Sequence, residues 1–379
     1  MIYHKKMKIS AALVILAICL SCSQGNITGT TVEVLPISSQ GTDFIKDGEP
    51  INFIGAFTFP TLTHILYEEN SENWQEEIDD YLSSLKEVGI SVIRLFGFGP
   101  YEIDISGSDT PNWTRLDYLL SQCEQEGIYV IFVLWDYWDY AGGQASDNND
   151  PNEIYAYWDD ERILPAINDI VTRYKDRDII FGWELINEGD AETIFEYYDE
   201  VFAWVSEAAV VVKSIDSNHL VSTGFTNEAF SEAYFGKIFP DNPEMYETLN
   251  NRSTAIHNIK DIDYMTFHSY GGNIDNMTDG SWYDEDWFQQ MSWYISKTVT
   301  IQNDVGKPMI HEEWGVQRQV GDETRLDVYS YMLAFFEENG INNIFNGWGD
   351  ETEPESMMIY LNDDAIVSQI RETLGRYNF

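Results

Sequence analysis

The amino-acid sequence predicts an α/β fold, namely a closed (β/α)8 barrel (TIM barrel) formed by a single domain with a short N-terminal hairpin. Eight apolar runs of strand length alternate with helical patterns along the 379 residues. The runs are nearly continuous in apolar residues, which is typical of parallel strands covered by helices. No phosphate-binding glycine signature follows the first strand, and this favours a barrel over the alternative, an open doubly wound sheet.

The predicted elements begin with the hairpin. The stretch "GTDFIKDGEPINFIGAF" (41–57) reads as a hairpin with a turn at Asp47-Gly48 that leads into the first barrel strand. Helical patterns over 71–89 and 113–127 end in glycine just before the next strand. The eight strands are expected at Ile51–Phe57, Ser91–Phe98, Tyr129–Trp135, Ile179–Asn187, Leu220–Phe225, Tyr264–Tyr270, Pro308–Trp314 and Asn343–Trp348.

The beginning of the chain has the pattern of an export signal. A basic start precedes an apolar run from Ile9 to Leu20, too short to span a membrane but typical of a signal-peptide core. Ser21 directly before Cys22 resembles a bacterial lipoprotein cleavage site, although Cys19 stands where Leu is usual. We therefore expect export, with a lipid on Cys22 that anchors the protein to a bacterial outer membrane or in the periplasm or at the cell surface.

This pattern divides the chain into three parts. Residues 1–22 are the expected lipoprotein-type signal peptide, 23–41 a polar tether, and 42–379 the (β/α)8 catalytic domain. With a lipid on Cys22, the mature domain has Cys123 as its one thiol and no disulfide framework. Because Cys123 lies in a helical pattern, we expect it to be buried and inert.

Composition and charge narrow the class of ligand. The formal net charge is 21 minus 65, or −44, and such a field repels nucleic acid and anionic membrane surfaces. A neutral substrate fits this charge better than an anionic polymer. Aromatic residues make up 15% of the chain, enough for a large core or for a groove of flat rings that suits sugars. We expect a monomer whose only membrane contact is its lipid anchor.

The active site of such a barrel lies at the carboxyl ends of its strands. Polar and aromatic residues stand at several of these ends. They are Arg94 in strand two, Trp138 after strand three, Asn187 and Glu188 after strand four, His268 and Tyr270 after strand six, Glu312 and Glu313 in strand seven, and Trp348 after strand eight.

Two carboxylates that face each other across a barrel mouth suit the cleavage of a glycosidic bond. One acts as the acid on the leaving oxygen, and the other attacks the anomeric carbon or activates water. Glu188 would pair with a glutamate of strand seven. Alternation places Glu312 and Glu313 on opposite faces and does not choose between them. The separation of the two carboxylates, which decides between retention and inversion, is not fixed by the sequence either.

The other strand-end residues suit supporting roles. Arg94 would keep a catalytic carboxylate ionised and oriented. The Asn187 amide would bind a sugar hydroxyl. Tyr270 would donate a hydrogen bond to the nucleophile, and His268 would set the polarity around it.

Trp348 would form a stacking floor for a sugar ring, and Trp138 would contribute a second ring. No metal or other cofactor is expected, because the six histidines form no H-E-x-x-H motif and there is no C-x-x-C motif. The acidic loop Ser146–Glu153 lacks the spacing of an EF-hand.

From about residue 42 to its end, the chain resembles glycoside hydrolase family 5, a family of retaining barrel glycosidases. "WELINEGD" (183–190) is similar to the family's W-E-L-x-N-E-P at the acid/base, which implies that role for Glu188. "GKPMIHEEWG" (306–315) is similar to its nucleophile motif, in which the glutamate directly before the aromatic residue attacks. The resemblance therefore selects Glu313. The other matching positions are Arg94, Asn187, His268, Tyr270 and Trp348.

Within that family the sequence is most similar to endo-β-1,4-mannanases. "WDYWDYAGG" (135–143) is similar to their W-x-x-x-G-G stretch after strand three, and 247–270 is similar to their segment before strand six. Asp136 and Tyr137 depart from the usual Asn-Asn, and Gly189 replaces the usual proline.

The resemblance implies a retaining endo-β-glycanase that cuts β-1,4 linkages of a neutral polysaccharide, mannan or glucomannan first, by double displacement. Runner-up activities on the same scaffold are a β-glucanase or cellulase and an exo-β-mannosidase. A non-catalytic glycan-binding lipoprotein is the alternative from a different class, and it predicts the loss of a catalytic glutamate.

Overall fold

A computed structural model provides the coordinates of the protein. It describes residues 34–67, 72–97, 113–137, 163–190, 197–226, 243–270, 285–349 and 356–379. The expected signal peptide with Cys22, and Trp138, lie outside these residues.

Eight parallel strands form one sheet in the order β8-β7-β6-β5-β4-β11-β10-β9. Along the chain, neighbouring strands are hydrogen-bonded, and the last strand, β11, pairs with the first, β4. All eight predicted strands are therefore confirmed. They are β4 (Ile54–Phe57), β5 (Val92–Phe96), β6 (Tyr129–Val133), β7 (Ile180–Glu184), β8 (Leu220–Ser222), β9 (Met265–His268), β10 (Met309–Glu313) and β11 (Asn342–Phe345).

The two edge strands of this sheet, β8 and β9, also meet. Ser222 forms a parallel bridge with Tyr264, which directly precedes β9. The Asp263 backbone N–H donates to the Val221 carbonyl at 2.7 Å, and His268 donates to Thr226 at 3.0 Å. These bonds close the sheet into the predicted barrel, so that β8 and β9 each have a neighbouring strand on both sides.

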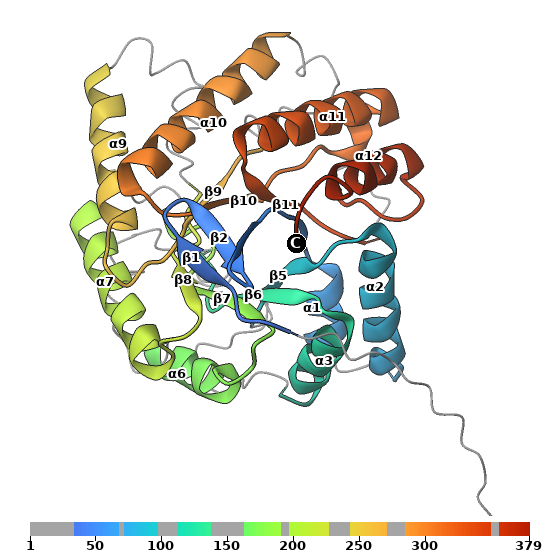
Figure 1. Ribbon diagram of the computed structural model, residues 1–379, viewed down its shortest axis with the longest axis horizontal. Coiled ribbons are helices and arrows are strands. Elements are labelled where there is room, and N and C mark those ends of the chain that lie inside the picture. Colours follow the sequence, from blue (N-terminus) through green and yellow to red (C-terminus); the bar gives the residue numbers. More distant parts are fainter. Residues whose placement is uncertain are drawn as a thin grey trace, which may run out of the picture. The chain divides into compact units, whose positions relative to one another are not determined.

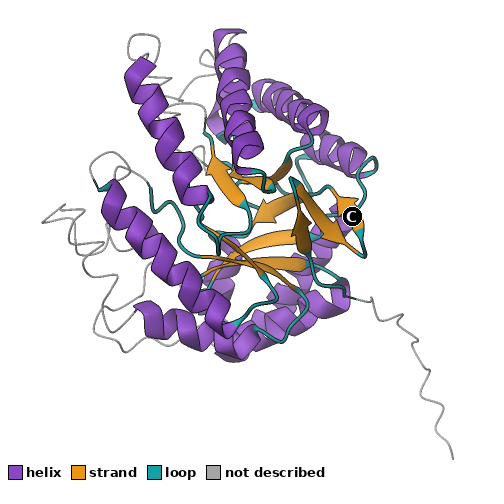
Figure 2. Cartoon of the chain, turned by 60° about the vertical axis from the view of Figure 1, so that its left-hand side comes forward, coloured by secondary structure: helices purple, strands orange, loops and turns teal. Residues whose placement is uncertain are grey.

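Helices surround the strands as an outer ring (Figures 1 and 2). The predicted helix over 71–89 is α2, whose apolar stripe Ile78, Tyr81, Leu82, Leu85 and Val88 is buried. The helices are α1 (Thr61–Tyr67), α2 (Trp74–Val88), α3 (Trp113–Glu126), α6 (Ile163–Tyr174), α7 (Tyr198–Ile215), α9 (Pro243–His257), α10 (Glu285–Val305), α11 (Asp322–Asn339) and α12 (Asp364–Leu374), with a 3-10 turn η5 (Arg318–Val320).

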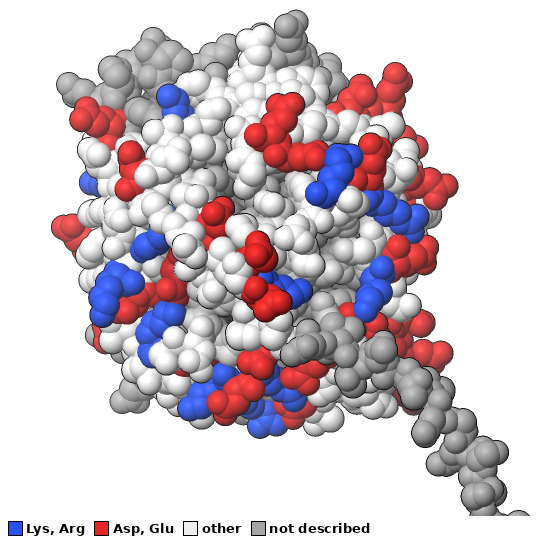
Figure 3. Space-filling model, in the orientation of Figure 1, with Lys and Arg blue, Asp and Glu red and all other residues white. Residues whose placement is uncertain are grey.

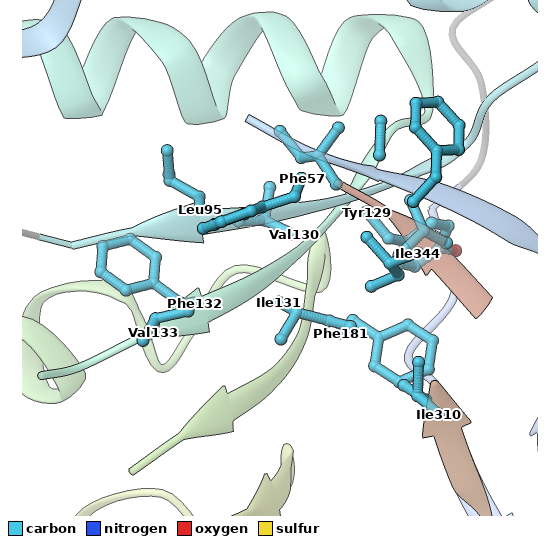
Figure 4. Close-up of a cluster of buried hydrophobic side chains, with 14 of the residues drawn as sticks. Phe57, Leu95, Tyr129, Val130, Ile131, Phe132, Val133, Phe181, Ile310 and Ile344 are labelled. Atoms are coloured by element: carbon cyan, nitrogen blue, oxygen red, sulfur yellow. The ribbon is translucent and has the colours of Figure 1, made fainter. Parts of the chain in front are cut away.

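The core lies between the strands and between the sheet and its helices. Figure 4 shows apolar side chains from β5, β6, β7, β10 and β11 gathered in one cluster. Cys123 of α3 is fully buried, as expected, and burial raises the pKa of its thiol. The thiol therefore stays protonated and unreactive at neutral pH.

A three-stranded antiparallel sheet precedes the barrel and consists of β1 (Ser38–Gln40), β2 (Asp43–Lys46) and β3 (Glu49–Ile51). The predicted hairpin is its β2–β3 part. Asp47 and Gly48 both have positive φ angles, 52° and 79°, as a two-residue hairpin turn requires.

The strand β1 corrects the expected tether over 23–41. Ile37 is buried, and the backbone of Leu35 exchanges two hydrogen bonds with the Tyr129 hydroxyl, at 3.1 and 2.7 Å. The tether prediction was wrong for residues 34–41, because Val34 and Ile37 pack against the core and residues 38–40 pair with β2.

The hairpin packs against the amino ends of the barrel strands through Phe44. Its ring is fully buried and contacts the rings of Phe53, Phe181 and Tyr264, with centroid distances of 6.2, 5.1 and 5.4 Å. Each of these partners lies at the start of a barrel strand. The hairpin therefore covers the end of the barrel opposite to the carboxyl ends, where the candidate site lies.

The surface carries the negative charge that the sequence predicts. Figure 3 shows more acidic than basic side chains on the face seen in Figure 1, and many basic groups lie beside acidic ones. Exposed ion pairs include Arg371–Glu87 at 3.0 Å and Arg376–Glu372 at 3.1 Å. Among the described residues, no helix is both long and apolar enough to cross a membrane.

Replacing Phe44 with alanine should test the role of the hairpin. Loss of a fully buried ring that three other rings contact is expected to lower the free energy of unfolding by about 3–5 kcal/mol. Urea denaturation followed by circular dichroism measures this. Val210→Ala is the matched control, because the Val210 side chain is 55% exposed and should change stability by less than about 0.5 kcal/mol. Equal midpoints for the two variants would show that the hairpin does not stabilise the barrel.

Candidate active site

The centre of the candidate site is the guanidinium group of Arg94 on β5, which is fully buried. It donates to Glu184 through Nε (2.9 Å to Oε2) and Nη2, to Glu313 through Nη1, and to the Asn187 side-chain oxygen at 2.7 Å. Burial alone would lower the pKa of Arg94, but Glu184 and Glu313 outweigh it and raise that pKa well above its ordinary value. A permanent cation thus links β5, β7 and β10.

Glu184, the last residue of β7, was not among the predicted site residues. It is fully buried and binds Arg94 with both carboxylate oxygens, the bidentate geometry that guanidinium and carboxylate groups favour. The signal in the sequence was an acidic residue inside an apolar strand, together with Arg94 inside another. A buried charge is costly unless an opposite charge pairs with it, so two such residues in strands of the same barrel indicate an ion pair.

An irregularity in β10 explains why alternation along the strand does not distinguish Glu312 from Glu313. The register with β9 shifts between His311 and Glu313, so that strict alternation fails at this point. Glu312 is fully buried, whereas Glu313 is 5% exposed. A β-bulge typically redirects a side chain beside an active site, and here Glu312 and Glu313 both lie close to Arg94.

Both carboxylate oxygens of Glu313 have donors. Arg94 binds Oε1, and the Tyr270 hydroxyl binds Oε2. Tyr270 in turn accepts a hydrogen bond from Asn346 Nδ2 at 2.9 Å. Burial raises the pKa of Tyr270 well above its ordinary value, as does Glu313, so the phenol remains a donor. Burial also raises the pKa of Glu313, and His268, Arg94 and Tyr270 oppose that rise.

Asn346 was also missed by sequence reasoning. It directly follows β11 and stands two residues before Trp348, the residue predicted for this strand end. A short polar residue between a strand and a glycine is common at turns, so the sequence alone did not single it out.

Glu188 reaches the site through an unusual backbone conformation. Its φ angle is +57°, in the left-handed region, and its N–H donates to the Gly224 carbonyl at 2.8 Å. Alternation would direct Asn187 and Glu188 to opposite faces, but this turn of the backbone takes Glu188 out of the strand pattern. Gly224 is required here, because a Cβ on it would lie 2.1 Å from the Ile186 carbonyl oxygen.

Glu188, His268 and Glu313 form a compact group. One carboxylate oxygen of each glutamate and one ring nitrogen of the histidine all lie within 4.8 Å of one another. His268 Nδ1 lies 2.7 Å from Glu188 Oε1 and 3.8 Å from Glu313 Oε1. Burial lowers the pKa of His268 to about 4, so the ring is neutral at pH 7. A neutral ring can donate to an ionised Glu188 or accept from a protonated one.

The same three side chains are spaced closely enough for a metal ion, and the physical setting argues against that use. Both oxygens of Glu313 are already bound by Arg94 and Tyr270. A divalent cation would have to displace one of these donors and would lie beside a buried guanidinium charge, which repels it. The arrangement suits acid–base and nucleophilic chemistry by two carboxylates instead.

Asn187 is held on both sides by other side chains. Its oxygen accepts from Arg94, and its Nδ2 donates to Asp136 Oδ1 at 2.7 Å. An amide nitrogen carries two hydrogens, and the bond to Asp136 uses one of them. The second hydrogen suits the predicted contact with a sugar hydroxyl. Asp136, which the sequence flagged as a departure from the usual asparagine, thus orients Asn187.

Trp348 does not lie where it was expected. Its side chain is fully buried, its indole N–H donates to Ser84 of α2 at 2.7 Å, and its ring packs on Phe345 and Tyr360. A sugar cannot stack on a ring with no exposed face, so the prediction of a stacking floor was wrong for Trp348. The hydrogen bond to Ser84 holds the indole against α2 and away from the mouth of the barrel.

Comparison with known proteins agrees with the geometry. The family model described as "GH family 5 beta-mannosidase-like" matches residues 156–346, half of the 379-residue chain. The chain is 26% identical over 313 residues to mannan endo-1,4-beta-mannosidase F of Aspergillus fumigatus. The aligned residues cover 74% of this chain and 64% of that protein. It spans 61–64% of the length of this relative and two similar ones.

Solved structures share the fold. A family 5 mannosidase from Rhizomucor miehei superposes with a TM-score of 0.66 at 17% identity, over 90% of this chain and 97% of that one. An endo-1,4-beta-mannanase from the same organism superposes with a TM-score of 0.63 at 21% identity, over 90% and 98% of the two chains.

The protonation of His268 gives a test of the site that requires no substrate. Because burial lowers its pKa to about 4, the imidazole resonances should titrate near pH 4 and not near 6.5. The unfolded chain takes up this proton below pH 6.5 and the folded chain only below about 4. His268 should therefore destabilise the fold as the pH falls from 6.5 to 4, with no effect above 6.5.

Nuclear magnetic resonance of protein with isotope-labelled histidine measures the titration, and the signal that a His268→Gln variant lacks is assigned to His268. A midpoint near 6.5 would show that the ring is hydrated like a free imidazole, contrary to its burial.

Proposed function

The chain belongs to glycoside hydrolase family 5, with a β-mannosidase-like catalytic region, and from this premise we propose that it is a retaining endo-β-1,4-mannanase. Its substrate is a neutral β-1,4-linked polysaccharide, mannan or glucomannan first. The observation that carries the proposal is the pair Glu188 and Glu313 at the carboxyl ends of β7 and β10, whose nearest oxygens lie within 4.8 Å.

The spacing of the two carboxylates supports retention. Retaining glycosidases hold them about 5–5.5 Å apart, whereas inverting enzymes leave about 6.5–9.5 Å for a water molecule. One oxygen of Glu188 and one of Glu313 lie within 4.8 Å of each other, closer than the spacing that inverting enzymes keep for that water. Glu313 therefore attacks the anomeric carbon directly.

In the first step Glu313 forms a covalent bond to the anomeric carbon while Glu188 gives its proton to the leaving oxygen. Arg94 and Tyr270 orient the attacking carboxylate, and Arg94 favours its ionised form against the effect of burial. In the second step Glu188, now a base, takes a proton from water, which attacks the same carbon and releases Glu313.

His268 suits this change of roles at Glu188. Its Nδ1 lies 2.7 Å from the Glu188 carboxylate, and a neutral imidazole makes this hydrogen bond with either protonation state. Asn187, fixed by Arg94 and Asp136, offers an amide hydrogen to a sugar hydroxyl beside the reacting carbon.

The relatives named as mannan endo-1,4-β-mannosidases support mannan as the substrate, and the −44 charge supports a neutral polymer. Endo action is part of the proposal and predicts a mixture of oligosaccharides; release of mannose alone would favour an exo-β-mannosidase. A lipid anchor at Cys22 and a monomeric state also belong to the proposal, and partition between membrane and soluble fractions tests the anchor.

Replacing each glutamate by glutamine tests the two roles. With mannan as the substrate, Glu313→Gln should reduce the release of reducing ends to background, and Glu188→Gln should reduce it by about 10²–10⁴-fold. On an aryl mannoside whose leaving group needs no proton, Glu188→Gln should still form the glycosyl-enzyme. Reducing-sugar and burst assays measure both.

Glu372→Gln is the matched control, because Glu372 is a 70% exposed side chain on α12 whose ion pair with Arg376 contributes little. A wild-type protein that binds mannan but cuts no polysaccharide would favour the glycan-binding alternative. Cleavage of a β-glucan but no mannan would show the substrate assignment to be wrong.

The stereochemistry of the product is the second test. Double displacement should release the β-anomer first, because two inversions at the same carbon restore its configuration. Proton magnetic resonance of a mannan digest, recorded before the anomers equilibrate, distinguishes the two products. Initial release of the α-anomer would contradict the nucleophilic role of Glu313.

A further inference from the structure

Three carboxylates surround the single guanidinium of Arg94, and the mechanism above uses only one of them. Glu184 binds Arg94 with both oxygens, and Glu313 binds it with one. The third, Glu312, has its Oε2 atom 3.7 Å from Arg94 Nε, which is too far for a hydrogen bond. The Arg94, Glu184 and Glu312 side chains are fully buried, and that of Glu313 is 6% exposed.

Glu312 lacks the donors that a buried carboxylate needs. No N–H or hydroxyl group of the described residues donates to either of its oxygens. The Glu184 carboxyl group is a close neighbour, because both groups face Arg94 Nε, with Glu184 Oε2 at 2.9 Å and Glu312 Oε2 at 3.7 Å. Two carboxyl groups can form a hydrogen bond only when one of them carries a proton.

The groups that face Glu312 come from every neighbouring strand. Arg94 faces it from β5 and Glu184 from β7, while Glu313 follows it on β10. From the β9 side come His268, whose Nε2 lies 3.9 Å from Glu312 Oε2, and the buried Tyr264 phenol. His268 is neutral at pH 7, and Tyr264, whose pKa burial raises, remains a neutral phenol. Arg94 is thus the one cation among the described groups that face Glu312.

The charge balance requires a proton in this group. With all three carboxylates ionised, one buried cation would face three buried anions, and a buried like charge is strongly unfavourable. Burial and the Glu184 charge raise the pKa of Glu312 well above its ordinary value, while Arg94 acts in the opposite direction. His268 Nε2 lies 3.9 Å from Glu312 Oε2, beyond hydrogen-bonding distance, which leaves the Glu184 carboxylate as the neighbouring acceptor suited to that proton.

We propose that Glu312 and Glu184 share one proton at neutral pH, and that Glu312 is a positioning residue that holds the Glu184 carboxylate against Arg94. Glu184 then neutralises the Nε and Nη2 side of the guanidinium, and Nη1 remains directed at Glu313. The pair carries one negative charge and not two, so the positive charge of Arg94 still favours the ionised nucleophile. The catalytic part of this inference rests on the proposed function; the shared proton does not.

Infrared difference spectroscopy at neutral pH tests the shared proton without any substrate. Wild type minus Glu312→Gln should show the carbonyl stretch of a buried protonated carboxylic acid. Glu184→Gln should lose the same band, because the remaining carboxyl group then pairs with Arg94 as a carboxylate. If one variant fails to fold, the difference spectrum of the other still shows whether the carbonyl band is lost. Absence of the band from the wild type, or its persistence in either variant, overturns the proposal.

Kinetics test the positioning role. Glu312→Ala should lower kcat/KM on mannan by about 100-fold, since a small displacement of a reacting group costs about that much. Glu312→Gln, which is neutral and keeps a donor for Glu184, should restore most of that loss and keep the acidic limb of the pH profile at its wild-type position. Equal losses of kcat/KM in the two variants, or a shifted acidic limb of the pH profile in Glu312→Gln, overturn the positioning role. A wild-type protein inactive on every polysaccharide defeats the proposed function alone, since the infrared result still stands.

Discussion

The ion pair between Arg94 and Glu184 is the constraint on which the candidate site depends. It joins β5 to β7 inside the barrel, where a single unpaired charge would cost several kcal/mol. With Glu184 fixed, the remaining guanidinium donors have defined directions, toward Glu313 on β10 and toward the Asn187 side chain beyond β7. The proposed nucleophile, Glu313, and the Asn187 amide are thus positioned by one planar group, whose fork geometry a lysine could not reproduce.

The barrel itself was predictable because its physical requirements are repeated eight times. Each strand is buried on both faces and reads as an apolar run, and each helix carries one apolar stripe and often ends in glycine. The runs extend beyond the strands at their ends, because residues such as Leu185 and Ile186 remain buried after the ladder of β7 stops. The location of the candidate site could be predicted as well, since parallel strands bring their carboxyl ends to one rim.

What the sequence could not supply was the direction of individual side chains. The bulge in β10 disturbs alternation, so Glu312 and Glu313 could not be distinguished by parity. Glu184 and Asn346 gain their meaning only from partners on other strands. Trp348 stood at a strand end like the others, but the hydrogen-bond acceptor that holds it away from the mouth of the barrel belongs to a helix about 260 residues earlier in the chain. Long-range partners of this kind leave no local pattern.

The left-handed backbone conformation of Glu188 lowers the stability of the fold at a residue that the proposed reaction requires. A non-glycine residue with a positive φ typically costs about 1–3 kcal/mol, and the surrounding structure must hold it in place. A glycine at position 188 would relieve this strain and at the same time remove the proposed proton donor. Mutational drift toward greater stability is therefore opposed here by selection for activity, and inactive descendants of this chain are expected to lose this glutamate early.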